Sequence, residues 1–407
     1  MTLRLPTGQG GGALSRRQAL TFGSGAVATI LVRPGLAQEE AERHGMSAFG
    51  DLKYPPDFKH FDYVNPDAPK GGVFSQVGPS RQYNQNFLTF NSLNSFILKG
   101  EGALGMELTF AILMVATVVI KPDYGPFEWN TLTLAALPLA FAAAAQTAIV
   151  LSGGIDLSIG PLMALANVLS LHATLGHDLA YSLGAAAVVL LVVTIAGALN
   201  GAIIVVTRVP DIVITLATSF IWAGVALLVL ARPTPGIPLD FQNLAQGSAV
   251  SPWVPNALLL LFVIPLLWVP LRRSRAGLSI YAVGSDRNAA FRSGVDLGWT
   301  RVLAYAVGGF FAACGGLALS MTTGVGTPLA GTLYTLSAVS AIVLGGVSLA
   351  GGRGGMLGPV AAAYILSLIP AVLIYLGIDP NYGQMIQGVL IVLVVMIGGI
   401  GAVLRRT

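Results

Sequence analysis

RRSRAGLSIYAVGSDRNAAFRSGVDLGWTR, residues 272–301, is the stretch from which the fold can be read. It carries six arginines and is flanked on both sides by long apolar runs with almost no charge. A basic segment between apolar spans is held on the cytoplasmic side of a membrane by its positive charge. The stretch therefore predicts a polytopic membrane protein and sets the direction of its spans. The simplest interpretation is that the stretch only anchors this topology.

Charge is unevenly distributed around this stretch. Residues 1–107 hold 10 of the 22 Lys and Arg and 9 of the 18 Asp and Glu, whereas the other 300 residues hold 12 and 9. Soluble domains are roughly 25% charged, so the chain divides into a polar head and a long membrane body. The net charge of +4 reflects topology, and no nucleic-acid partner is expected. Because Cys314 is the only cysteine, neither a disulfide nor a thiolate metal site is expected.

From residue 104 onward the sequence contains about ten apolar runs, most of them long enough for membrane helices. Leucine, alanine, valine and glycine without period-two alternation favour helices over a barrel. We therefore predict an all-α polytopic membrane domain over residues 104–407. The runs are residues 104–121, 131–151, 158–176, 179–206, 212–231, 252–271, 302–323, 334–351, 358–378 and 383–404.

Positive charge orients these spans. Placing residues 272–301 inside gives ten basic residues on the inner side and only two, Lys121 and Arg232, on the outer side. The inner ones beyond the stretch are Arg208, Arg353, Arg405 and Arg406. We expect this protein to lie in a bacterial inner membrane, and the asymmetry predicts that its C-terminus is in the cytoplasm.

The first 37 residues have the pattern of an export signal. Arg16 and Arg17 precede an apolar run of about 14 residues, 19–32, which is too short to span a membrane. The pattern is similar to a bacterial twin-arginine signal. A working signal would carry residues 38–103 outside, against the direction set by the body. We expect the charges of the body to prevail and the head to stay inside as a poorly ordered tail.

Residues 38–103 are hydrophilic and rich in aromatic residues. The strings FKHFDY at 58–63, NPDAPKGG at 65–72 and FLTFNS at 87–92 resemble the start of oligopeptide-type periplasmic solute-binding proteins. Such proteins bind their ligand between two lobes, which about 70 residues cannot supply. We interpret the head as a truncated fragment of such a protein, fused to the membrane body.

The string SGGIDLSIG, residues 152–160, is the most distinctive motif of the body. Its carboxylate, Asp156, is the only acidic residue between Glu128 and Asp178. Asp156 or Ser158 is expected to cap the helix that follows. The alternative is an ion or proton relay, which would need further carboxylates or histidines within the spans. The residues assigned to the motif are Gly153, Gly154, Asp156, Ser158 and Gly160.

At this string the chain resembles the permease subunit of ribose-type ABC sugar importers. The resemblance continues through GALNG at 197–201, VPDIVITLAT at 209–218, IYAVGSDRNAA at 280–290 and LGGVS at 344–348, and it covers residues 110–404. It implies a homodimeric or heterodimeric pore, two cytoplasmic ATPase subunits and a periplasmic sugar-binding protein. No GxxxxGK[ST] phosphate-binding loop occurs in the chain, so ATP is expected to be used by the partner subunits. We therefore expect no catalytic site, metal or cofactor in this chain.

The resemblance gives the arginine-rich stretch a second role. NAAFRSG at 288–294 resembles the Glu-Ala-Ala-x-x-x-Gly pattern by which importer permeases dock on their ATPases, with Asn288 in place of the acid. We predict a short helix over residues 286–293, ended by Gly294, that presents Ala289 and Ala290 to the partner. The residues of this predicted coupling loop are Gly284, Asp286, Arg287, Asn288, Ala289, Ala290, Arg292 and Gly294.

A sugar path needs hydrogen-bonding groups and flat apolar faces within the spans. The candidates are Gln146, Asn167, Asn200, Thr215, Thr218, Ser219, Trp222 and Gln387. Each could instead make a hydrogen bond between helices. Three other functions stay open at this point: a branched-chain amino-acid type permease, a membrane-tethered peptide-binding protein, and a fusion product without function.

Overall fold

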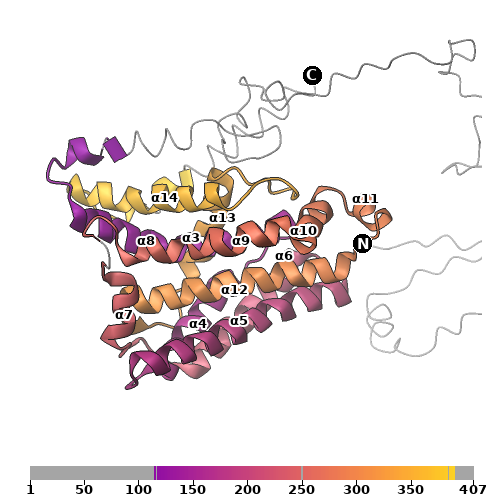
Figure 1. Cartoon of the computed structure of the whole chain (residues 1–407), viewed down its shortest axis with the longest axis horizontal. Helices are drawn as coiled ribbons and strands as arrows, with labels where there is room; N and C mark the ends of the chain where they lie inside the picture. The colour runs from indigo at the N-terminus through magenta and orange to yellow at the C-terminus, as the bar shows by residue number, and fades with distance from the viewer. Residues whose placement is uncertain (1–113, 116, 249–250, 384, 390–407) are drawn as a thin grey trace, which may run out of the picture. The chain divides into compact units, whose positions relative to one another are not determined.

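The computed structural model describes residues 114–389 apart from 116, 249–250 and 384 (Figure 1). The predicted signal and head, and most of the first and last predicted spans, lie outside the described residues. In chain order the elements are α3 (Pro126–Leu151), α4 (Ile159–Thr174), α5 (Leu179–Thr207), α6 (Asp211–Val229), β1 (Thr234–Pro235), α7 (Leu239–Gln246), α8 (Asn256–Leu261), α9 (Val263–Arg273), α10 (Arg275–Ser285), α11 (Arg287–Arg292), α12 (Leu297–Thr323), β2 (Val325–Gly326), α13 (Thr332–Leu344) and α14 (Leu357–Tyr375).

The predicted all-α membrane fold is confirmed. Among the described residues, six helical segments are long and apolar enough to cross a membrane: α3, α5, α6, α8 together with α9, α12 and α14. Two of the predicted spans correspond to the shorter apolar helices α4 and α13. Within the described residues, β1 and β2 form one short antiparallel pair, in which Thr234 lies opposite Gly326.

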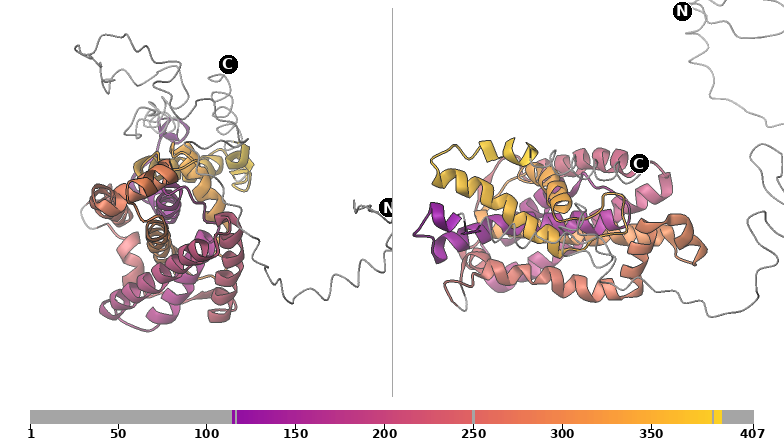
Figure 2. Two further views of the ribbon diagram at one scale, coloured as in Figure 1. Left: turned by 90° about the vertical axis from the view of Figure 1, so that its right-hand side faces the viewer. Right: turned by 90° about the horizontal axis from the view of Figure 1, so that it is seen from above.

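Helix α3 lies in the interior of the helical body. The end-on view in Figure 2 shows it surrounded by other helices, and it contacts α12, α13 and α14. Its apolar residues occur all around the helix, as expected of a buried helix rather than a surface one. Pro126 stands in its first turn, where the missing N–H costs nothing, and Glu128 accepts a hydrogen bond from the backbone N–H of Gly125.

Glycines allow α12 to lie close to its neighbours. A Cβ added at Gly309 would lie 2.8 Å from the carbonyl oxygen of Val193 on α5, and one at Gly315 would lie 2.9 Å from the Met163 side chain on α4. Real Cβ atoms do not approach other atoms this closely. In a membrane the hydrophobic effect does not drive helices together, and close packing through small residues does so instead. This explains the paired glycines of this helix.

Several helix boundaries differ from the sequence prediction, among them the start of α3 at Pro126 in place of residue 131. Helix α12 begins at Leu297, five residues early, because Asp296 caps it by accepting from the N–H of Trp299. Helix α13 ends at Leu344 and not at residue 351, because Gly346 and Gly351 have left-handed backbone angles that end a helix. The predicted span at 252–271 is divided into α8 and α9 at Phe262.

Candidate coupling and transport site

The predicted coupling loop comprises the end of α10 and the short helix α11. Asp286 connects them and caps α11, because its carboxylate accepts from the N–H groups of Asn288 at 2.8 Å and Ala289 at 3.0 Å. Gly294 follows α11 with φ +79°, a left-handed angle that glycine adopts without strain. The local sequence thus starts and stops a helix of six residues, inside the predicted 286–293.

The exposed face of α11 differs from the predicted one. Ala289 is exposed, but Ala290 is 4% exposed and faces inward, so the prediction that both alanines are presented to a partner is wrong for Ala290. Its small side chain lets α11 pack on its own protein. Asn288 and Arg292 are exposed, and beside them the ring of Phe291 is 69% exposed. Phe291 was missed because the pattern treats it as a variable position.

Backbone contacts join the coupling loop to two other segments. A Cβ added at Gly284 in α10 would collide with the carbonyl oxygen of Leu151 and lie 2.6 Å from the backbone nitrogen of Gly352. The N–H of Gly352 in turn donates to the carbonyl of Leu151 at 3.0 Å. Arg287 adds a long hydrogen bond of 3.4 Å to the carbonyl of Gly153. The ends of α3 and α10 and the connection from α13 to α14 therefore meet at one junction.

The motif at residues 152–160 contains the turn between α3 and α4. Gly153 has a left-handed φ of +80°, which favours glycine. The Asp156 carboxylate accepts from both the N–H and the hydroxyl of Ser158, each at 2.6 Å. Ser158 precedes α4, but its side chain caps none of the first-turn N–H groups. Of the two caps predicted, that by Ser158 is therefore wrong, whereas Asp156 accepts from the N–H of Ser158, the residue directly before the helix.

Burial controls the protonation of Asp156, which is 1% exposed. Burial raises the pKa of its carboxyl to about 6, and the hydrogen bonds from Ser158 lower it less. The nearby Asp211 carboxylate contributes a further, smaller rise. Burial therefore favours the neutral form of this carboxyl.

A chain of hydrogen bonds leads from this turn to α5 and α6. The amide of Asn200 donates to the Ser158 hydroxyl at 2.7 Å and accepts from the indole N–H of Trp222 at 3.1 Å. Thr215 makes a weaker bond, 3.4 Å, to the carbonyl of Ile155. The structure thus brings together three of the predicted path residues and two of the motif.

An ion pair beneath the same turn was missed by sequence reasoning. Arg301 on α12 pairs with Asp211 at the start of α6, and both side chains are largely buried. The Tyr305 hydroxyl donates to Asp211 at 2.9 Å. A Cβ added at Gly154 would lie 2.6 Å from the same carboxylate, so the turn packs directly against this ion pair. Opposite charges at two span ends on one side of the membrane could have indicated it.

The starts of α4 and α13 also touch. A Cβ at Gly160 would collide with the carbonyl of Gly331, and one at Gly331 would collide with the carbonyl of Gly160. Further along α4, Asn167 holds the strand that precedes α13: its amide donates to Val325 O at 3.1 Å and accepts from Thr327 N at 2.6 Å. The Asn167 amide also donates to the Ser320 hydroxyl on α12 at 2.9 Å, which is the helix-contact alternative for this residue.

The remaining path candidates lie apart. Gln146 is buried on α3, and neither its amide nitrogen nor its amide oxygen has a hydrogen-bond partner. Thr218 and Ser219 donate to the backbone of their own helix, and Ser219 is half-buried. Gln387 donates to Leu366 O at 3.0 Å. Within the described residues, no three His, Cys, Asp or Glu side chains lie close enough to hold a metal ion.

Comparison with known proteins places this arrangement in a family. Residues 128–395 match the family model described as branched-chain amino acid transport system / permease component. The chain belongs to this permease family. The matched residues include the whole junction around Gly284 and the network around Asp156.

Individual relatives of this permease family carry more specific names. The chain is 30% identical to a ribose import permease protein of Bacillus subtilis (strain 168), over 72% of this chain and 92% of the relative. It is 29% identical to a fructose import permease protein of Rhizobium meliloti, over 75% and 87%. It is 30% identical to an autoinducer 2 import system permease protein of Enterobacter sp. (strain 638), over 73% and 86%. No solved structure gives a significant match.

Proposed function

We propose that this chain is the membrane-spanning permease subunit of an ABC importer that carries a monosaccharide of the ribose type. The observation that carries the proposal is the match to import permeases named for ribose and fructose over 72% and 75% of this chain, together with the family match of residues 128–395. The geometry supports it, since α10 and the exposed α11, here called the coupling hairpin, are joined by backbone contacts to the ends of membrane helices. Such a hairpin suits a subunit that receives movement from a partner.

The nearest rival is a branched-chain amino-acid permease. The family description names branched-chain amino acids, whereas the relatives described above are named for ribose, fructose and autoinducer 2. A sugar is favoured because those relatives match over most of both chains. The peptide-binding alternative does not account for the match of residues 128–395 to a permease family.

The ATPase partners are proposed to dock on α11. Its exposed side presents Asn288, Ala289 and Arg292 around the ring of Phe291. A large exposed ring beside small and basic residues is a suitable anchor for a groove in a partner. Asn288 would donate or accept a hydrogen bond where the family pattern has an acid. ATP is then hydrolysed by the partners, and this chain needs no nucleotide site of its own.

Movement of the ATPases would be transmitted through Gly284. Since α10 touches the last carbonyl of α3 and the loop before α14, a displaced hairpin must move both together. The movement of α3 would pass to the turn at residues 152–158 and so to the start of α4. It would reach the start of α13 through the contact between Gly160 and Gly331. Rigid-body rocking of packed helices of this kind is how alternating access is produced in transporters.

The substrate path is proposed to run along α6. Helix α6 packs mainly on α4 and α5, and its other face is open. Ser219 and Trp222 are both half-buried on this helix, and Trp222 lies beside Asn200. An indole ring and hydroxyl and amide groups together fit the apolar face and hydroxyls of a sugar. A second copy of a permease, identical or not, would close the open face and complete the pore.

The arginine-bearing end is proposed to face the cytoplasm, together with the C-terminus. The other end, with β1, β2 and α7, would then receive a periplasmic sugar-binding protein. The head, residues 1–103, is proposed to be a signal-like segment and a truncated binding-protein fragment without a part in transport.

Uptake by proteoliposomes tests the function. The full chain would be reconstituted with candidate ATPase and binding-protein partners, and entry of labelled ribose, fructose and leucine would be measured. We expect ATP-dependent entry of a sugar and none of leucine. Leucine entry without sugar entry would reject the sugar assignment and favour the branched-chain amino-acid permease.

Docking is tested by Phe291→Ala. We expect the variant to insert normally and to lose at least tenfold of the co-purified ATPase, as anchor residues of interfaces do. Phe127→Ala is the matched control, because Phe127 is also exposed, at 78%, but lies at the start of α3. Equal co-purification by the two variants would show that α11 is not the docking element.

A further inference from the structure

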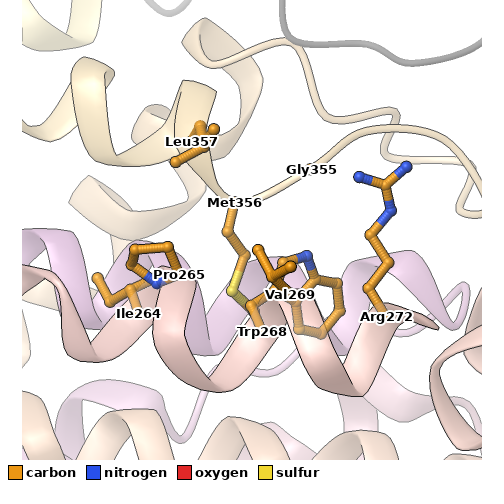
Figure 3. Close-up of a pocket in the computed structure, with 8 residues that line it drawn as sticks. All are labelled: Ile264, Pro265, Trp268, Val269, Arg272, Gly355, Met356 and Leu357. Atoms are coloured by element: carbon orange, nitrogen blue, oxygen red, sulfur yellow. The ribbon is translucent and has the colours of Figure 1, made fainter. Parts of the chain in front are cut away.

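A shallow groove lies between α9 and the start of α14. Its floor consists of the buried side chains of Ile264, Trp268 and Met356, and Val269 and Leu357 stand exposed at its edges (Figure 3). The hollow is small, about 70 Å³. Its apolar lining continues onto exposed side chains of the same helices, so it is suited to an extended apolar chain and not to a compact ligand.

A cation closes one end of this groove. Arg272 lines it, with its guanidinium carbon 5.9 Å from the centre of the Tyr281 ring. The Tyr281 hydroxyl donates to Gly354 O at 2.8 Å, which ties α10 to the loop beside the groove. Figure 3 shows the guanidinium group beyond the apolar side chains, on the side of Gly355. The cation therefore has a fixed place next to an apolar channel.

More positive charge surrounds Arg272, without balancing acids. Arg273 and Arg275 are exposed at the same helix end. The ion pairs found among the described residues are Lys121–Glu128 and Arg301–Asp211, so none involves these three arginines. An occupant with an anionic head and an apolar tail matches both the arginines and the groove.

We propose that this groove binds an anionic phospholipid of the cytoplasmic leaflet, with its phosphate at Arg272 and part of one acyl chain on Trp268 and Met356. Basic pockets beside membrane helices bind such headgroups, and each arginine near the surface strengthens the binding about fivefold. The leaflet rests on the orientation proposed above, whereas the site itself is independent of the transported substrate. A lipid at this position would brace α9 against α14 beside the coupling hairpin.

Lipid retention by the full chain provides the test. The chain would be purified from nanodiscs containing phosphatidylglycerol and phosphatidylcholine with identical acyl chains, and retained lipid would be counted by native mass spectrometry. We expect a preference for phosphatidylglycerol that falls about fivefold in Arg272→Gln and stays unchanged in Arg232→Gln, an exposed arginine beyond the end of α6. Val269→Trp, which fills the groove and keeps the arginines, should lower the retention of that lipid.

Several results would overturn the proposal. One is equal phosphatidylglycerol retention by wild type and Arg272→Gln, and another is an equal loss in Arg232→Gln. Unchanged retention in Val269→Trp would remove the acyl-chain part. Loss of ATPase co-purification in Arg272→Gln with lipid retention intact would assign the arginine to the partner instead. Because no transport is measured, failure of the sugar assignment leaves the lipid result unaffected, and the reverse also holds.

Discussion

Gly284→Ala is expected to uncouple ATP hydrolysis from transport. The added Cβ would collide with the carbonyl oxygen of Leu151 and lie 2.6 Å from the nitrogen of Gly352. Both are backbone atoms, which cannot rotate out of the way as a side chain can. The three segments must therefore separate at the junction, while the exposed face of α11 is left unchanged.

The magnitude follows from two opposing effects. Overpacking costs about 1–3 kcal/mol, and contact with two backbone atoms places this substitution at the upper end. Alanine in place of glycine inside a helix returns about 1 kcal/mol. The net loss of about 2 kcal/mol corresponds to a shift of roughly 30-fold in the equilibrium between the joined and the separated junction.

The assay compares sugar uptake with ATP hydrolysis in the same proteoliposomes. We expect the Gly284→Ala complex to retain its ATPase subunits but to move at least tenfold less sugar per ATP. Gly184→Ala is the matched control, because that helical glycine in α5 has open space where the Cβ would stand. If both variants keep the ratio of the wild type, the backbone junction does not transmit movement and the reasoning is refuted.

Three further substitutions test the buried network. In the folded protein the raised pKa of Asp156 holds its proton more tightly than the unfolded chain does, so stability falls as pH rises from about 4 through 6. Asp156→Asn should therefore gain up to about 3 kcal/mol over wild type above pH 7, seen as a difference in melting temperature that is absent at pH 4. Asp211→Asn should lose about 3–5 kcal/mol, because it leaves Arg301 buried without its partner; an unchanged melting temperature would argue against the pair. Trp222→Phe keeps an aromatic ring but loses the hydrogen bond from the indole N–H to Asn200. We expect a higher KM for sugar with an intact ATPase rate. An unchanged KM would remove Trp222 from the path.

Much of the fold follows from the sequence because the membrane imposes a simple rule on it. Long apolar runs must become helices, and the runs at 179–206 and 358–378 correspond closely to α5 and α14. The rule fails where backbone angles matter more than hydropathy. Gly346 and Gly351 shorten α13 although the residues around them are apolar.

The site was predictable in its parts but not in its assembly. The motif at 152–160 and the loop at 284–294 stand out as strings, yet nothing in the chain shows that Gly284 touches Leu151. Contact between residues so far apart depends on helix packing. Arg301 illustrates the same limit: it was counted as a topological charge, but helix α12 carries it inward to Asp211.

The most direct test of the central proposal is whether sugar entry through this chain depends on ATP hydrolysis. Proteoliposomes holding the full chain, its ATPase partners and a sugar-binding protein would be supplied with ATP or with a non-hydrolysable analogue, and accumulation of labelled ribose and fructose would be followed. We expect accumulation against a gradient with ATP and none with the analogue. Sugar flux that is the same with both nucleotides, or accumulation of leucine alone, would contradict the proposal.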